Sequence, residues 1–88
     1  GGVSEWLKVA HMAAAQDIPV SPHIFTEHSL QLCAAVSNVN YAEHMPWFTG
    51  LFKEKMELVD GDIIIPNRPG MSFSFDPDAV ERFTIPLP

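Results

Sequence analysis

Two side chains capable of acid–base chemistry, His23 and Glu43, stand at the ends of two short apolar segments. Residues 18–25 and residues 41–45 both have strand-like composition, and their prolines, which lack an N–H group, fall near the segment ends, where a sheet tolerates them. In parallel α/β proteins the carboxyl ends of the strands surround the functional site. The sequence therefore predicts that this imidazole and this carboxyl lie at one site.

Each of these side chains also has a purely structural interpretation. His23 could bond a neighbouring carbonyl at a strand end, and Glu43 could be a solvated carboxylate. A zinc site is disfavoured, because the inverted zinc-protease motif His-x-x-Glu-His needs its histidines four apart on one helix, whereas His23 and His28 are five apart. Cys33 falls within an apolar helix stripe and is expected to be an inert core thiol.

Two helices alternate with the two strands. Residues 4–16 repeat apolar side chains at helical spacing, with Ser4 as a candidate N-cap. Residues 27–36 predict a second helix, whose apolar stripe includes Cys33 and whose polar face carries Glu27 and Gln31. A turn is expected at residues 37–40. The order helix, strand, helix, strand predicts parallel strands joined by right-handed crossovers.

The rest of the sequence predicts a hairpin, a strand and a short helix. Residues 57–65 contain two apolar runs around Asp60-Gly61, a pair that suits a type I′ turn. Residues 71–75 alternate apolar side chains with serine, as a half-buried strand does. The Asp-Pro pair at residues 76–77 is typical of a capped helix start, and we expect that helix to run to Phe83.

We divide the chain into residues 1–46, with the strand and helix units, and residues 47–88, a C-terminal return segment. Parallel strands are buried on both faces and have open edges, so two such units need further strands beside them. The sequence begins Gly-Gly-Val-Ser without an initiator Met. We therefore expect an upstream segment that belongs to the same fold.

Composition narrows the function classes. The 88 residues are 47% hydrophobic, which indicates a folded chain. Five Lys and Arg face eleven Asp and Glu, for a net charge of -6, and this balance disfavours nucleic acid and anionic membranes as partners. No apolar run approaches the roughly 18 residues that span a bilayer. The single cysteine excludes an intrachain disulfide and favours a reducing, cytoplasmic location.

Several stretches of the sequence resemble the C-terminal part of the mandelate racemase/muconate lactonizing enzyme family, a branch of the enolase superfamily. They are Gly-Gly-Val-Ser-Glu-Trp-Leu-Lys-Val-Ala at the start, Val-Ser-Pro-His-Ile-Phe at residues 20–25, Tyr-Ala-Glu-His-Met-Pro-Trp at residues 41–47, and Val-Asp-Gly leading into Ile-Pro-Asn-Arg-Pro-Gly at residues 65–70. The resemblance covers essentially the whole chain. It implies the last units of a TIM-like (β/α)₈ barrel, from helix six to strand eight, and a return segment that packs on a capping domain.

The resemblance also implies a chemistry. In an acid-sugar dehydratase or racemase of this family, His23 would remove the proton α to a substrate carboxylate, and Glu43 would donate a hydrogen bond to that carboxylate. The intact enzyme would use Mg²⁺, held by strands that this sequence lacks, and the aspartate that pairs with His23 would lie before Gly1. We expect two catalytic groups here, no metal site, and no activity of the 88 residues alone.

An alternative is a free-standing acidic module that binds another protein. Exposed Trp47 and Phe48 and the hairpin edge would then form its binding surface. A cooperatively folded monomer would favour this alternative, whereas strand-swapped oligomers or aggregates would favour a separated piece of a barrel. A homo-oligomer is compatible with either interpretation. The substrate, and the choice between dehydratase and racemase, stay open from sequence.

Overall fold

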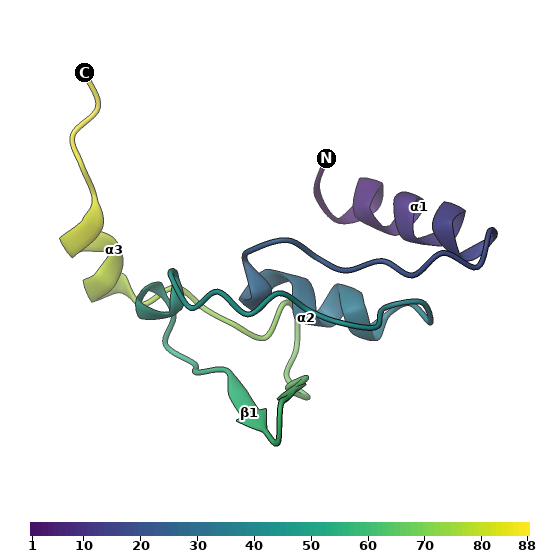
Figure 1. Ribbon diagram of the computed structural model, residues 1–88. Coiled ribbons are helices and arrows are strands. Elements are labelled where there is room, and N and C mark those ends of the chain that lie inside the picture. The colour runs from purple at the N-terminus through teal and green to yellow at the C-terminus, as the bar shows by residue number, and fades with distance from the viewer.

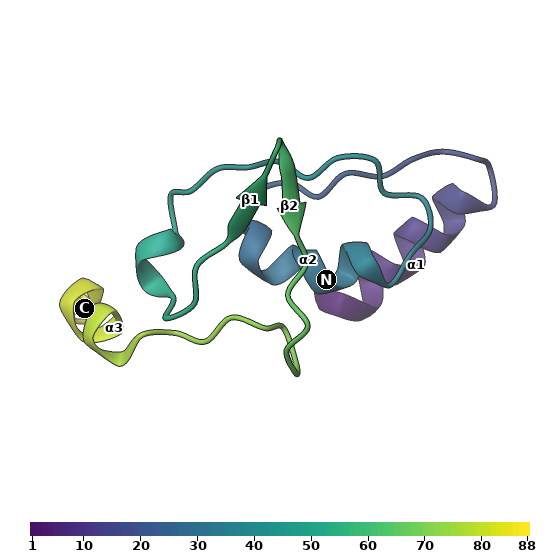
Figure 2. The ribbon, with the colours of Figure 1, turned by 90° about the horizontal axis from the view of Figure 1, so that it is seen from below.

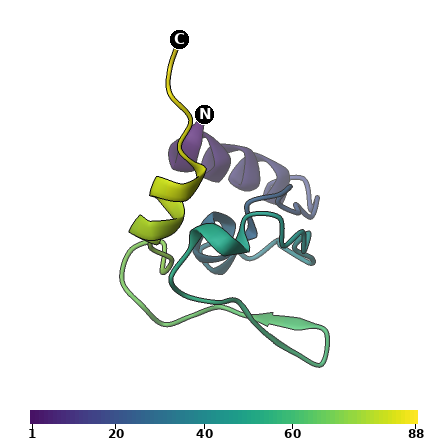
Figure 3. The ribbon, with the colours of Figure 1, turned by 90° about the vertical axis from the view of Figure 1, so that its left-hand side faces the viewer.

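The computed structural model describes all 88 residues and has an open shape (Figure 1). Its elements are α1 (Gly2–Ala14), α2 (Thr26–Ala34), the 3-10 helix η1 (Thr49–Leu51), β1 (Glu57–Val59), β2 (Asp62–Ile64) and α3 (Pro77–Phe83). Helices α1 and α3 lie at opposite ends of the molecule (Figures 1 and 2). The hairpin projects away from the helices (Figures 1 and 3). The Cα radius of gyration is 14.7 Å, against about 12 Å for a compact domain of this length.

Helix α1 has the predicted location, but its start differs from the prediction. The helix begins at Gly2, with Gly1 at the N-cap and no side-chain cap bond. Ser4 lies inside the helix, so its prediction as the N-cap is wrong. Glycine at the N-cap costs only a few tenths of a kcal/mol relative to serine. Ala10 is the buried residue of the helix, and it faces the extended chain that follows.

Helix α2 is also present, but its predicted polar face is wrong. Glu27, expected toward solvent, is only 1% exposed, and Gln31 is half-buried. Gln31 Nε2 donates to the Pro66 carbonyl at 2.7 Å and to Ser72 Oγ at 2.8 Å. The helical periodicity predicted that only one face of α2 is covered. In the structure the return segment covers a second face and supplies polar partners there.

The two predicted strands are reduced to a single parallel bridge. Val20 pairs with Val39, and the Val20 N–H donates to the Asn38 carbonyl at 2.8 Å. The parallel direction is confirmed, but the predicted extents, residues 18–25 and 41–45, are wrong, and the second partner lies within the predicted turn. Two of the residues near Val20 are prolines, which cannot donate ladder hydrogen bonds.

The hairpin is confirmed. Strands β1 and β2 are antiparallel, with Leu58 opposite Ile63. Asp60 has φ 50° and Gly61 φ 87°, and positive φ at both central residues defines the type I′ turn. The cap of α3 is confirmed as well, because the Asp76 side chain accepts a hydrogen bond from the Asp78 N–H at 3.0 Å, with Pro77 in the first turn.

The core lies between α2 and the return segment. Leu30, Phe52 and Phe73 form its buried cluster, and only nine of the 88 residues are buried in all. The strand predicted at residues 71–75 is wrong, because Ser72 turns the chain with φ 72° and only Phe75 pairs, with Phe52, in an antiparallel bridge. None of the helices is long and apolar enough to cross a membrane.

Candidate active site

The structure brings His23 and Glu43 together. His23 Nε2 lies 3.8 Å from Glu43 Oε2, and the two side chains are 80% and 38% exposed. Each follows one of the two segments joined by the Val20–Val39 bridge, on the carboxyl side. Because parallel segments end at the same edge, the imidazole and the carboxyl reach one point from separate parts of the chain. Their convergence agrees with the prediction, while their chemical roles stay predictions.

Glu43 is oriented by the backbone that follows His23. The Ile24 N–H donates to Glu43 Oε2 at 2.7 Å, and the Thr26 hydroxyl donates to the Glu43 carbonyl. The first bond involves Oε2 alone, so Oε1 has no hydrogen-bond partner within the chain. The carboxyl is thus held at one oxygen and available at the other.

The backbone beside His23 is strained. Ile24 has φ 51° and Phe25 has φ 44°, and Phe25 also has ψ 49°, a left-handed conformation, as the N-cap of α2. This conformation costs a non-glycine residue about 1–2 kcal/mol. Two such residues in succession persist only where the surroundings hold them, and strain of this kind gathers at functional sites.

An aromatic stack covers this strained turn. The Phe25 and Phe48 rings are stacked, with centroids 4.2 Å apart and planes 7° apart. The His28 ring stacks on Phe25 at 6.2 Å and meets the edge of Phe52 at 5.3 Å. Sequence reasoning missed this cluster because its members follow no helical or strand period.

Other candidate groups do not add a metal or a nucleophile. No group of three or more His, Cys, Asp or Glu side chains is gathered to hold a metal ion. Cys33 is half-buried, and burial raises the pKa of its thiol above the usual value, partly offset by a hydrogen bond from its own backbone. A higher pKa means less thiolate at neutral pH, which favours the inert thiol that we expected, although Cys33 is half-buried and not part of the core.

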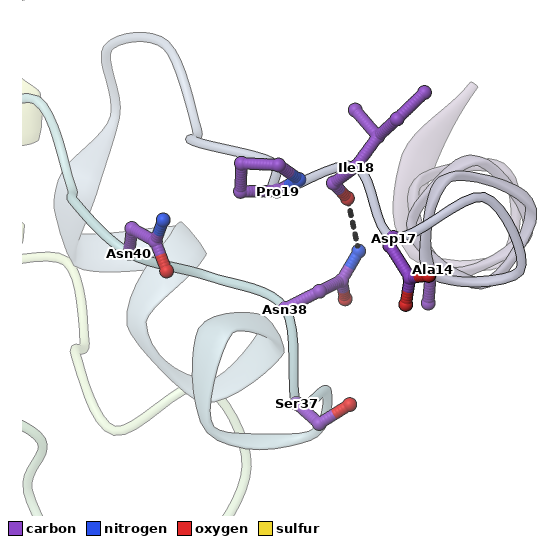
Figure 4. Close-up of a pocket in the computed structure, with 7 residues that line it drawn as sticks. All are labelled: Ala14, Asp17, Ile18, Pro19, Ser37, Asn38 and Asn40. Atoms are coloured by element: carbon purple, nitrogen blue, oxygen red, sulfur yellow. Dashed lines mark hydrogen bonds between the residues drawn. The ribbon is translucent and has the colours of Figure 1, made fainter.

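A cavity of about 340 Å³ lies at the other end of the bridged segments, before Val20 and around Val39. Asn38 lines it and donates from Nδ2 to the Ile18 carbonyl at 3.0 Å (Figure 4). The same Nδ2 also donates to the Ala10 carbonyl at 3.0 Å. These bonds tie α1 to both segments. In parallel α/β barrels the amino-terminal ends of the strands contribute stability and the carboxyl-terminal ends chemistry, so His23 and Glu43 stay the predicted site residues. The cavity lining consists of Ala14, Asp17, Ile18, Pro19, Ser37, Asn38 and Asn40.

Comparison with known proteins identifies the family. Residues 1–79 match the family described as enolase C-terminal domain-like. The chain belongs to this family. The resemblance noted in the sequence is thereby confirmed, and the chain is a member of the enolase superfamily.

Curated relatives of this enolase-superfamily chain include several sugar-acid enzymes. It is 37% identical to the L-talarate/galactarate dehydratase of Salmonella typhimurium over 90% of this chain and 20% of that protein. It is 34% identical to the D-xylonate dehydratase of Haloferax volcanii, and 30% identical to the D-galactarolactone cycloisomerase of Agrobacterium fabrum over 28% of that protein. The chain thus spans between 20% and 28% of the length of these relatives.

Solved structures of the superfamily share this fold. The Salmonella typhimurium dehydratase liganded with Mg and L-lyxarohydroxamate superposes with a TM-score of 0.85 at 36% identity, over 92% of this chain and 21% of that one. An enolase from Bradyrhizobium complexed with magnesium and mandelic acid also gives 0.85, at 27% identity, over 98% of this chain and 24% of that one. The open fold of this chain therefore matches between a fifth and a quarter of each of these enzyme structures.

Proposed function

We propose that this chain supplies the proton-transfer side of an acid-sugar dehydratase or racemase. The observation that carries the proposal is the 3.8 Å pairing of His23 Nε2 with Glu43 Oε2, at the carboxyl ends of segments joined by a parallel bridge. Two relatives that align with most of this chain are named as dehydratases of L-talarate and galactarate and of D-xylonate. A carboxylate substrate of this kind is the ligand that such a pair suits.

His23 is the proposed general base. Its side chain is 80% exposed, so its imidazole can reach the proton α to the substrate carboxylate. In a dehydration the same imidazole then returns the proton to the departing β-hydroxyl, and in a racemisation a second group acts on the other face. Proton transfer by a positioned side chain contributes about 10²–10⁴-fold to a rate.

Glu43 is the proposed carboxylate-binding group. Its Oε2 accepts the Ile24 N–H at 2.7 Å, which leaves Oε1 to donate a hydrogen bond to the substrate carboxylate when Glu43 is in its acid form. That bond gains strength as the α-proton leaves and negative charge accumulates on the substrate carboxylate. A donor aimed at developing charge accelerates the step because it binds the transition state better than the substrate.

Mg²⁺ is the proposed cofactor of the intact enzyme, since structures of relatives hold it. A bound Mg²⁺ supplies positive charge where the substrate carboxylate gathers negative charge. The chain itself gathers no set of metal ligands, so the residues present here do not fit a magnesium site. We propose that the ligands lie elsewhere in the enzyme and that the 88 residues alone are inactive.

We also propose that residues 1–46 are the last units of a (β/α)₈ barrel and that residues 47–88 return toward a capping domain. The open shape supports this proposal, because large apolar side chains such as Tyr41 and Trp47 are 78% and 68% exposed. In a free-standing protein-binding module, a core of this size would give little stability. Size-exclusion chromatography and circular dichroism of the 88-residue chain distinguish the barrel piece from the free-standing module. A cooperatively unfolding monomer would contradict the barrel proposal.

The test of the function uses the full-length gene product that contains these residues. With Mg²⁺ and a panel of α-deuterated galactarate, L-talarate and xylonate, we expect loss of the α-deuteron to solvent from at least one of them. His23→Asn should slow that exchange by about 10²–10⁴-fold, without a change in thermal unfolding. The matched control is His11→Asn, because His11 is an exposed histidine on α1. Exchange by His23→Asn at the parental rate would show that His23 is not the base.

A further inference from the structure

The strained turn between His23 and α2 is held from outside by the segment that follows Glu43. Ile24 and Phe25 have φ of 51° and 44°, a conformation that β-branched and aromatic residues rarely adopt. A turn with this conformation relaxes unless other contacts maintain it. Those contacts are therefore what fixes the direction of the Ile24 N–H.

Four separate contacts join residues 24–27 to residues 43–49. Two reach Glu43 itself: the Ile24 N–H donates to Oε2 at 2.7 Å, and the Thr26 hydroxyl donates to the carbonyl. The Thr49 hydroxyl donates to Glu27 Oε1 at 3.4 Å. The largest apolar contact is the stack of Phe25 on Phe48, at 4.2 Å between centroids.

We call these four contacts between residues 24–27 and residues 43–49 the clamp. The burial of residues 26 and 27 agrees with it. Thr26 and Glu27 are each 1% exposed, although both begin a helix next to a highly exposed histidine. Phe25 is 44% exposed, and its ring stacks on Phe48 and on His28. None of these contacts involves the His23 ring or Glu43 Oε1.

We propose that Phe25, Thr26 and Phe48 are positioning residues that hold the strained Ile24–Phe25 turn, so that the Ile24 N–H fixes the Glu43 carboxyl beside His23. This inference rests on the proposed function for its catalytic consequence, but the clamp itself is a structural statement. In this proposal Phe48, which follows the second bridged segment, affects catalysis only by keeping the Glu43 carboxyl in position. The proposal also accounts for the strained conformation beside a reactive group.

The decisive experiment is a double-mutant cycle between Phe48→Leu and Ile24→Gly in the full-length gene product. Glycine adopts positive φ without strain, so in the Ile24→Gly background the ring stack has only the strain of Phe25 left to hold. We expect Phe48→Leu to lower kcat for α-deuteron exchange by about tenfold in the wild-type background, with KM changed less than about twofold, and to have a clearly smaller effect in the Ile24→Gly background. Equal losses in the two backgrounds would overturn the clamp.

A conservative variant separates stacking from volume. Phe48→Tyr keeps a flat ring that can stack on Phe25, and the partly exposed position of Phe48 lets the added hydroxyl reach water. We expect this variant to retain kcat within about twofold. Phe83→Leu is the matched control, because Phe83 is 60% exposed on α3, and it should leave kcat unchanged. A Tyr variant as slow as the Leu variant would contradict a stacking role.

A second readout does not depend on catalysis. Hydrogen exchange of the Ile24 amide reports directly on its bond to Glu43, and Phe48→Leu should speed that exchange by about tenfold while Phe83→Leu leaves it unchanged. Faster exchange in Phe48→Leu in a protein that turns over no acid sugar would support the clamp and refute the proposed function. Unchanged amide exchange in an active enzyme would refute the clamp and leave the function standing.

Discussion

The two ends of the segments bridged by Val20 and Val39 are built in different ways. At the amino-terminal end, Asn38 ties the carbonyls of Ala10 and Ile18 at 3.0 Å, so hydrogen bonds there join three parts of the chain. At the carboxyl-terminal end, His23 is 80% exposed and the next two residues have positive φ. We infer that one end stabilises the fold and that the other holds the proposed reactive groups at a cost in stability. Substitutions at the two ends should therefore have different effects.

The largest expected effect is at the carboxyl-terminal end. Glu43→Ala removes both the acceptor of the Ile24 N–H and the proposed donor to substrate, and we expect a loss of about 100-fold in kcat/KM. Glu43→Gln keeps an oxygen acceptor and an N–H donor, and should lose about tenfold. Steady-state kinetics on the full-length gene product measures both variants. An Ala variant that loses no activity but unfolds at a much lower temperature would reverse the assignment of this end.

The next effect is at the amino-terminal end. Asn38→Ala leaves the carbonyls of Ala10 and Ile18 without their donor, and should lower the free energy of unfolding by about 1–3 kcal/mol. We expect kcat to stay within about twofold, since the deletion is remote from His23. Urea unfolding measures the stability change. The matched control is Asn40→Ala, an exposed residue that lines the same cavity; a similar loss there would argue against a specific tie by Asn38.

The smallest effect lies outside both ends, in the return segment. The Ser74 N–H donates to Glu54 Oε2 at 2.6 Å, and this bond lowers the pKa of Glu54 below its usual value of 4.5, with smaller contributions from its own backbone, the Ser74 hydroxyl and the charge of Arg68. Because the folded pKa is the lower one, the stabilisation is complete above pH 4.5 and is lost as the pH falls through the folded value.

The comparison of wild type with Glu54→Gln tests this dependence. The advantage of wild type in melting temperature should be small, because solvent screens this exposed carboxylate, and it should shrink steadily below pH 4.5. Differential scanning calorimetry across the acid range measures it. Neither kcat nor the amide exchange of Ile24 should change at neutral pH. An advantage that grows toward low pH would contradict the direction of the pKa shift.

Local chemistry in the sequence was enough to predict the elements that depend on it. The Asp60-Gly61 turn and the Asp76 cap were found because each requires particular residues at particular positions. The convergence of His23 with Glu43 followed from chain order, because parallel segments end at one edge. These predictions did not depend on which side chains pack together in the tertiary structure.

The features that were missed depend on tertiary packing. Glu27 was assigned to a solvent face, yet the return segment buries it. The positive φ of Ile24 and Phe25 has no signal in the sequence, since neither residue is one that favours that conformation. The predicted strands shrank to one bridge because strand length depends on neighbours as well as on composition.

The bonds of Gln31 have a consequence for synthesis of the chain. Its partners Pro66 and Ser72 lie 35 and 41 positions further on. The ribosome must therefore synthesise these additional residues before α2 can form the two bonds. A nine-residue helix is marginal by itself in water. The nascent polypeptide therefore carries α2 in a frayed state until Ser72 has been added, and its apolar side chains are open to chaperones until the return segment emerges.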